Sequence, residues 1–252
     1  MADTGFEIVC EIEPPTSAEM AVVREQIAVL KRTCDAFLVP DSHLGRATVS
    51  SVAVAHEVAY LQGRAIACLN ARDRNLLGFQ RDLLTAAAYG VRELLFVYGD
   101  PPSRGDRSTL TVRAMLEQVS EENVGARVGV AADLRREWPE WKHAADFVFT
   151  QMSFDPTAVA RWRDRSRFNG RVYAGVVVLA SDKMAHRLAR LIPGFDVPHK
   201  ILQRLGQSPN EGIDIAIEQI QRLREDGVVD GVHLIPARRY RQTAEALEAA
   251  GI

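Results

Sequence analysis

The chain has 252 residues, of which 47% are hydrophobic and 25% charged, and its formal net charge is −2. This ordinary globular composition has no basic or acidic block, which argues against nucleic acid or an anionic membrane as the main partner. No apolar stretch reaches the roughly 18 residues of a membrane span, and the N-terminus lacks a basic region followed by a long apolar one, so we expect a cytoplasmic protein.

Short apolar runs rich in Val, Ile, Leu and Phe recur along the whole chain and predict eight β-strands. Most of them lack period-2 alternation, which indicates strands that are covered on both faces, as in a parallel sheet. The predicted strands are residues 6–12, 35–40, 64–70, 93–99, 127–132, 146–152, 171–179 and 231–236.

Amphipathic stretches lie between the predicted strands and predict helices, most clearly at residues 17–33, 75–90 and 210–227. Ser17 and Asn75 stand where N-capping residues belong, and Gly90 and Gly227 stand where a glycine often ends a helix.

Eight successive strand–helix units in about 250 residues have the size and rhythm of a (β/α)8 barrel. We therefore predict an α/β fold in which residues 1–252 form a single TIM-type catalytic barrel. A doubly wound sheet is the main alternative, but it usually has a glycine-rich phosphate turn after its first strand, where this chain has EPPTS. Residues 192–209 are predicted to add a short helix between the seventh and eighth strands.

Polar residues follow the predicted strands at their carboxyl ends, where the chemistry of such a barrel takes place. Topology alone brings Glu11, Asp100 and Gln151 to this rim. One carboxylate at a strand end is more often a helix cap or a solvated loop residue, and the RDRN segment can be read as a salt-bridged N-cap. Several polar residues from different strands at one rim favour a binding or catalytic site. The others are Glu13, Asp41, Ser42, Asn70, Asp133 and residues 72–75 and 236–240.

Cysteine and histidine spacing argues against a bound metal. Cys10, Cys34 and Cys68 form no CxxC pair, and their odd number fits reduced thiols better than a disulfide framework. The six histidines show neither HxH nor HExxH spacing. His233, on the last predicted strand, is more often a core or rim histidine than a base. The arginines of residues 160–167 more often form a solvated helix face than a nucleic-acid patch.

Five segments together resemble the methylenetetrahydrofolate reductase family, in the same order along the chain. No single segment is diagnostic, but the ordered combination is specific and extends from about residue 7 to residue 236. The segments are EIEPPTS (11–17), NARDRNLLGFQRDLLTAAAYGVRELLFVYGDPP (70–102), AADFVFTQMSFD (144–155), AGVVVLAS (174–181) and DGVVDGVHL (226–234).

The resemblance implies that the chain reduces the methylene bridge of 5,10-methylenetetrahydrofolate to a methyl group. Hydride comes from NADH or NADPH, usually by way of bound FAD, while a carboxylic acid protonates a folate nitrogen so that the ring opens. Glu11 aligns with the catalytic acid, and Asp100 with an aspartate that serves catalysis, the pterin and the flavin. Gln151 aligns with a substrate-binding glutamine, and Leu205 falls near the usual stacking aromatic.

The positions that align with the family's flavin site depart from its pattern, so we expect weak flavin binding or none. Cys68 replaces His or Gln, Asn70 replaces Thr, and Tyr98 replaces the residue before Gly-Asp that normally reaches the flavin. The cofactor-binding residues that the resemblance implies are Cys68, Asn70, Tyr98, Gly99, Asp100, Ala132 and Asp133.

Three functions stay open on the sequence. The first is a flavin-dependent reductase, and the second is a reductase that passes hydride directly from nicotinamide to folate. The third is a non-catalytic folate or flavin binder that belongs to a one-carbon or demethylation system, although retention of Glu11, Asp100 and Gln151 argues against it. We expect a tetrahydrofolate derivative and a nicotinamide nucleotide as ligands, and we leave homo-oligomerisation open.

Overall fold

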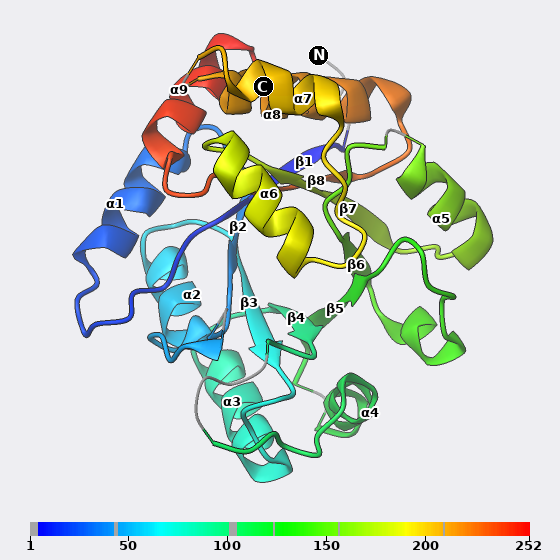
Figure 1. Cartoon of the computed structure of the whole chain (residues 1–252). Coiled ribbons are helices and arrows are strands. Elements are labelled where there is room, and N and C mark those ends of the chain that lie inside the picture. The colour runs from blue at the N-terminus through cyan, green and yellow to red at the C-terminus, as the bar shows by residue number, and fades with distance from the viewer. Residues whose placement is uncertain (1–4, 43–44, 101–104, 123, 156, 209) are drawn as a thin grey trace.

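The computed structural model is a closed barrel of eight parallel strands that is surrounded by helices (Figure 1). The structure describes residues 5–42, 45–100, 105–122, 124–155, 157–208 and 210–252. Neighbouring strands follow one another in chain order, and β8 pairs with β1 to close the barrel. The predicted (β/α)8 barrel and its eight strands are therefore confirmed. The strands are β1 (Glu7–Glu11), β2 (Ala36–Val39), β3 (Ala65–Asn70), β4 (Glu93–Val97), β5 (Arg127–Ala132), β6 (Phe147–Thr150), β7 (Arg171–Val177) and β8 (Gly231–Ile235).

The helix boundaries follow local capping chemistry in two of the three clearest predictions. The Asn75 side chain accepts a hydrogen bond from the Gly78 backbone N–H at 2.8 Å, and Gly90 and Gly227 have φ of +72° and +61° after their helices. The predicted cap at Ser17 is wrong: a bend occupies residues 16–18, and the first helix begins at Ala21. The double proline disfavours helical backbone at residues 13 and 14, because proline restricts the residue before it to extended backbone, and the bend then separates these residues from α1.

The helices are α1 (Ala21–Leu30), α2 (Ser51–Tyr60), α3 (Leu76–Ala88), α4 (Val112–Glu122), α5 (Ala158–Ser166), α6 (Asp182–Leu191), α7 (His199–Leu205), α8 (Glu211–Asp226) and α9 (Tyr240–Ala249), with the 3-10 helix η2 (Glu140–Ala144). The short α7 is the extra helix predicted within residues 192–209. In the part of the chain that the structure describes, no helix is long and apolar enough to cross a membrane.

The barrel interior is packed in layers. A middle layer of buried apolar side chains includes Val9, Leu38, Ile66, Leu95 and Phe149. Below it, at the amino-terminal ends of the strands, lies a charged floor that we define as Glu7, Arg64, Glu93, Arg127 and Arg171. Its ion pairs have N–O distances between 2.6 and 3.2 Å. Among the described residues, these layers therefore fill the interior up to the carboxyl-terminal strand ends, which we call the mouth of the barrel.

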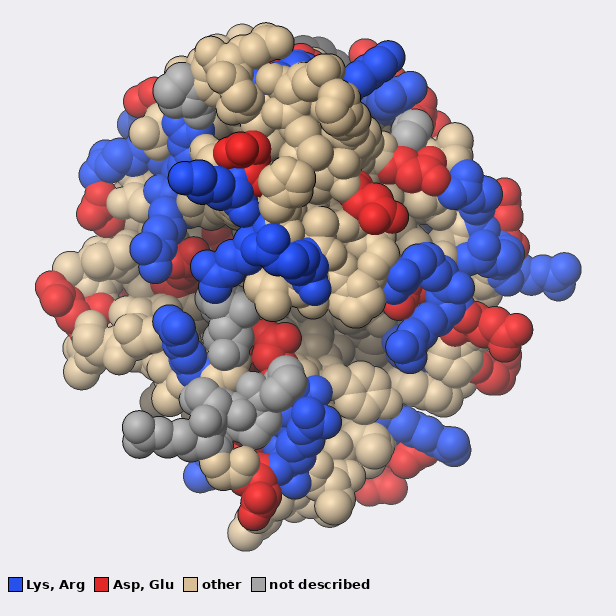
Figure 2. All heavy atoms as spheres, viewed as in Figure 1, with Lys and Arg blue, Asp and Glu red and all other residues tan. Residues whose placement is uncertain are grey.

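Helices α6 and α7 cover part of this mouth beside β7 and β8. Figure 1 shows α6 in front of the strands, and its apolar residues belong to one cluster with strand-end residues and α7. That cluster includes Met152, Val177, Met184, Leu188 and Ile235. On the same face, basic side chains gather over α6 (Figure 2), where Lys183, Arg187 and Arg190 are exposed.

Candidate functional site

Glu11 is the last residue of β1 and shares the interior face of the barrel with Val9. Its carboxylate Oε2 lies 3.2 Å from Nε2 of His233 on β8, and the two side chains are 16% and 11% exposed. The approach does not have hydrogen-bond geometry, and Nε2 is buried without a hydrogen-bond partner among the described residues. A carboxylate–imidazole contact that is largely shielded from solvent thus lies in the barrel mouth.

The chain after β1 is fixed by α1, which determines which of the two glutamates enters the mouth. The buried Gln26 side chain accepts from the Glu13 backbone N–H at 3.1 Å and donates to the Glu13 carbonyl at 3.4 Å. The Pro15 carbonyl accepts from the Val49 N–H at 2.9 Å. The Glu13 carboxylate lies 3.6 Å from the exposed Arg238 guanidinium. Glu11 and not Glu13 therefore faces the barrel interior.

Cys68 lies inside the barrel on β3 and is a neutral thiol. Burial raises the pKa of Cys68 well above its usual value, and the nearby carboxylates of Asp41 and Glu11 add to the effect. The residue is 7% exposed and belongs to the middle apolar layer. Cys68 therefore contributes an uncharged, weakly polar wall near Glu11.

Asn70, at the end of β3, is the hub of a buried polar network. Its Nδ2 donates to Asp41 Oδ2 at 2.9 Å and to Asp73 Oδ2 at 3.0 Å, while its Oδ1 accepts from two backbone N–H groups of the following turn. Arg74 donates to Asp41 at 2.6 Å and to Asp82 at 3.1 Å. Burial raises the pKa of Asp41 and outweighs the opposing effect of Arg74. The salt-bridged reading of the RDRN segment is thus confirmed.

The turn after β4 packs directly on this network. Gly99 has a φ of +80°, and a Cβ atom there would lie 2.8 Å from Cβ of Asn70. Only glycine accommodates both the backbone conformation and the close approach. On either side, Tyr98 is 55% exposed and Asp100 is also exposed. The close packing at Gly99 therefore presents two side chains at the rim.

The residues after β5 are held by ion pairs. Ala132 is buried in the layer between strands and helices, away from the barrel interior. Burial alone would raise the pKa of Asp133, but hydrogen bonds from the Arg135 backbone and guanidinium lower it. Arg135 also donates to the Pro193 carbonyl at 2.6 Å, which joins this loop to the segment between α6 and α7. Lys142 donates to the Ala131 carbonyl at 2.7 Å, and burial lowers the pKa of Lys142.

Gln151 follows β6 and lines two neighbouring pockets. Its side chain is exposed at the rim, and its Oε1 accepts from the Met152 N–H at 3.0 Å. The larger pocket, about 550 Å³, lies between the loops after β5 and β6 and the segment before α7. Its arginines are occupied: Arg161 pairs with Asp155 at 2.5 Å, and Arg165 donates to the Leu134 carbonyl at 2.7 Å.

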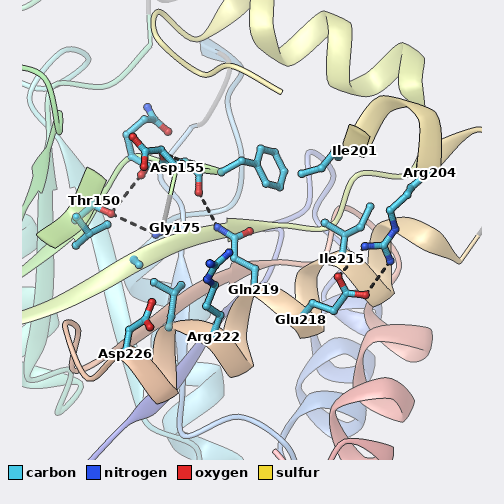
Figure 3. A pocket seen from close by; sticks show the side chains of 16 residues that line it. Thr150, Asp155, Gly175, Ile201, Arg204, Ile215, Glu218, Gln219, Arg222 and Asp226 are labelled. Carbon is cyan, nitrogen blue, oxygen red and sulfur yellow. Dashed lines mark hydrogen bonds and ion pairs between the residues drawn. The ribbon is translucent and has the colours of Figure 1, made fainter. Parts of the chain in front are cut away.

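The smaller pocket, about 210 Å³, lies on the helix side of β6 and β7, between α5 and α8 (Figure 3). Polar side chains of α8 border it: Gln219 donates to the Ser153 carbonyl at 2.6 Å, and Glu218 pairs with Arg204 at 2.7 Å. Leu205, next along α7, packs in the apolar cluster with α6. Of the predicted substrate residues, Gln151 therefore lines the smaller pocket, whereas Leu205 packs against α6.

The fold brings Glu11 and Cys68 together inside the mouth, with Asp100 and Gln151 at the ends of β4 and β6. His233 is buried on β8, as expected for a core or rim histidine, and nothing in the sequence alone pairs it with Glu11. Only its inward direction could be read from the sequence, because His233 alternates with Gly231 and Ile235 along β8, and alternate residues of a barrel strand face inward. Where the structure describes the chain, no group of three or more His, Cys, Asp or Glu residues could hold a metal ion.

Comparisons with known proteins point to one family. Residues 128–251 match the family model described as methylenetetrahydrofolate reductase. Over 212 residues, or 68% of this chain, the sequence is 24% identical to methylenetetrahydrofolate reductase 2 of Schizosaccharomyces pombe. The chain spans about a third of the length of that relative, 33%.

Solved structures share the barrel. An uncharacterized protein from Clostridium thermocellum, described as binding two copies of 5-methyl-5,6,7,8-tetrahydrofolic acid, superposes with a TM-score of 0.70 at 14% identity, over 97% of this chain and 93% of that one. A mutant tryptophan synthase alpha-subunit from Pyrococcus furiosus superposes with a TM-score of 0.58 at 11% identity, over 98% of both chains. At such identities the likeness shows the fold alone.

Proposed function

Because this chain belongs to the methylenetetrahydrofolate reductase family, we propose that it is a reductase-like oxidoreductase acting on folate. It transfers a hydride from NADH or NADPH to 5,10-methylenetetrahydrofolate and forms 5-methyltetrahydrofolate. The observation that carries the proposal is the position of Glu11, whose carboxylate stands in the barrel mouth beside His233 and is only 16% exposed.

Glu11 is the proposed general acid. The five-membered ring of the substrate opens when a nitrogen attached to the methylene carbon is protonated, and a positioned carboxylic acid can supply that proton. The clamp of Gln26 on the Glu13 backbone holds the strand end that carries Glu11.

The two other aligned residues are proposed to bind the ligands. Asp100, exposed at the rim after β4, is proposed to bind the pterin and to assist the reaction as a carboxylate. Gln151, exposed after β6, is proposed to hold the folate and the nicotinamide in turn through its amide. Leu205 is proposed to supply an apolar contact to the substrate from the side of α7.

FAD, when bound to a protein of this kind, supplies a two-electron carrier between the nicotinamide and the folate. The residues aligned with its site fit it poorly. The Asn70 amide is engaged by Asp41, Asp73 and the backbone, Cys68 is a neutral wall, and Ala132 lies outside the interior. This favours a second candidate, in which hydride passes directly from nicotinamide to folate, with Glu11 in the same role.

Turnover assays test the proposal. The purified protein is incubated with 5,10-methylenetetrahydrofolate and NADH or NADPH, with and without added FAD, and 5-methyltetrahydrofolate is measured by chromatography. We expect product that depends on the nicotinamide. A strong requirement for FAD supports the flavin route, and equal rates without FAD support direct transfer. If folate binds but no product forms under either condition, the chain is a folate binder and the proposed function is wrong.

A further inference from the structure

We propose that His233 is a positioning residue for Glu11: it orients the Glu11 carboxylate and supplies the proton that Glu11 passes to the folate in each turnover. This inference rests on the proposed function. Its basis is the 3.2 Å separation of His233 Nε2 and Glu11 Oε2, together with the absence of any hydrogen-bond partner for Nε2 among the described residues.

The surroundings hold the imidazole firmly against Glu11. His233 pairs in register with Val9 of β1 on one side and with Gly175 of β7 on the other. Its ring and that of Phe149 meet in a T-shaped contact, with ring centroids 5.2 Å apart. Because β1 and β8 are hydrogen-bonded along their length, the separation of the two side chains is set by the sheet itself.

The charged and titratable groups around His233 leave Glu11 as its ionic partner. The residues that β6 and β7 place against it are Phe149 and Gly175, and neither carries a charge. Tyr173 stacks on Phe149, but its hydroxyl donates to Glu7 of the charged floor at 2.6 Å. Cys68 on β3 is a neutral thiol.

A purely structural role explains this arrangement badly. A buried ring nitrogen without a hydrogen bond destabilises a fold, and catalytic sites are one place where such groups are retained. A small change in angle would turn the contact into a charge-assisted hydrogen bond, and catalytic contacts often tighten only when substrate binds.

The proposed proton transfer is balanced. The Nε2–H bond of the imidazolium breaks, an O–H bond forms on the Glu11 carboxylate, and His233 becomes neutral. The O–H bond of Glu11 then breaks as the proton passes to the folate nitrogen, and the Glu11 carboxylate is restored. Solvent at the open mouth protonates the imidazole again. The sequence delivers one solvent proton to the folate for each hydride transferred, and His233 itself undergoes no redox change.

Two substitutions separate orientation from proton supply. His233→Phe keeps a ring against Phe149 but removes both functions, whereas His233→Gln keeps an N–H donor near the position of Nε2 and cannot titrate. We expect kcat to fall about 10²-fold in His233→Phe, the order of general acid–base effects, and to recover only partly in His233→Gln. The KM for folate should change less than about twofold if His233 acts only through Glu11.

A double-mutant cycle tests whether the two residues act together. In a Glu11→Gln background, His233→Phe should lower kcat no further. Independent, multiplying effects of the two substitutions would overturn the proposal, as would wild-type kcat in His233→Phe.

A second measurement does not depend on turnover and distinguishes this inference from the proposed function. Imidazole signals are followed by NMR against pH in the wild-type protein and in Glu11→Gln, with His233 assigned from the His233→Gln spectrum. Since a carboxylate favours the imidazolium, the His233 midpoint should move to lower pH in Glu11→Gln. His56, which stacks on Tyr89 outside the barrel, is the internal control and should not move. An unchanged His233 midpoint would overturn the pairing even in an active enzyme; a shifted midpoint in a protein without turnover would refute only the proposed function.

Discussion

The buried amide of Asn70 makes a sharp prediction about stability. Asn70→Ala removes two hydrogen bonds to the carboxylates of Asp41 and Asp73 and two from backbone N–H groups. Bonds to charged groups contribute about 1.5–3 kcal/mol each and neutral ones about 1 kcal/mol. A plain sum overstates the loss, because Asp41 keeps the Arg74 guanidinium and the backbone N–H of residue 70, and the side chain of Asp73 is 38% exposed to water.

We therefore expect Asn70→Ala to lower the free energy of unfolding by about 2–3 kcal/mol and the melting temperature by roughly 4–12 °C. Urea unfolding followed by circular dichroism gives the first value, and calorimetry gives the second. Asn75→Ala is the matched control: it removes one exposed capping hydrogen bond nearby and should cost about 1 kcal/mol.

The comparison of the two variants decides the matter. If Asn70→Ala is no less stable than Asn75→Ala, the polar network contributes little, and the argument that Asn70 is committed to structure and unavailable to a cofactor fails. A loss of the expected size with unchanged turnover would separate the structural role from catalysis.

Four further predictions concern chemistry and pH. Glu11→Gln should fold normally and bind folate but lose about 10²–10⁴-fold in turnover, measured where chemistry limits the rate; wild-type turnover would contradict the assignment of the acid. Gln151→Ala should weaken both folate and nicotinamide binding by roughly 1–3 kcal/mol in calorimetric titrations, and a change in only one ligand would indicate separate sites. Flavin titration followed by fluorescence should give weak binding, and nanomolar affinity would show that the reading of Cys68, Asn70 and Tyr98 is wrong. Asp155→Asn tests electrostatics: hydrogen bonds from Arg161 and Thr157 lower the pKa of Asp155 to about 2 from 3.8, so the wild type should be slightly more stable than the variant above pH 3.8 and lose that advantage as pH falls to about 2. Because Asp155 is largely solvated, the difference should stay below about 1 kcal/mol, and a difference that grows on acidification would refute the pairing.

The strands of this barrel could be predicted because each one is a short apolar run covered on both faces. The order of the strands then follows from the repeating strand–helix rhythm, and it brings Glu11, Asp100 and Gln151 to one end. The helix start near Ser17 was missed because capping propensity is local, whereas the bend after Pro14 and Pro15 shifts the whole start of α1.

The contacts within the site could not be predicted from the sequence, because they join residues that are far apart along the chain. Sequence placed Asn70 at a strand end but could not show that Asp41, 29 residues away, would occupy its amide. The contact between His233 and Glu11 joins the first and last strands and depends on closure of the barrel. Ala132 aligns with a cofactor position of the family, but a sequence alignment does not determine the register of β5. That register points Ala132 away from the barrel interior.

The charged floor makes the two ends of the barrel different. Among the described residues, its ion pairs and the apolar layer above them fill the amino-terminal end, so Glu11 and His233 are open to water and protons from the side of the mouth. If the proposed function is right, a folate bound at the mouth blocks this route. The proton that the proposed reaction consumes would then be present before the substrate binds and would be replaced only after the product leaves. Each substrate would therefore receive one stored proton, and renewal of that proton would be coupled to the exchange of product for substrate.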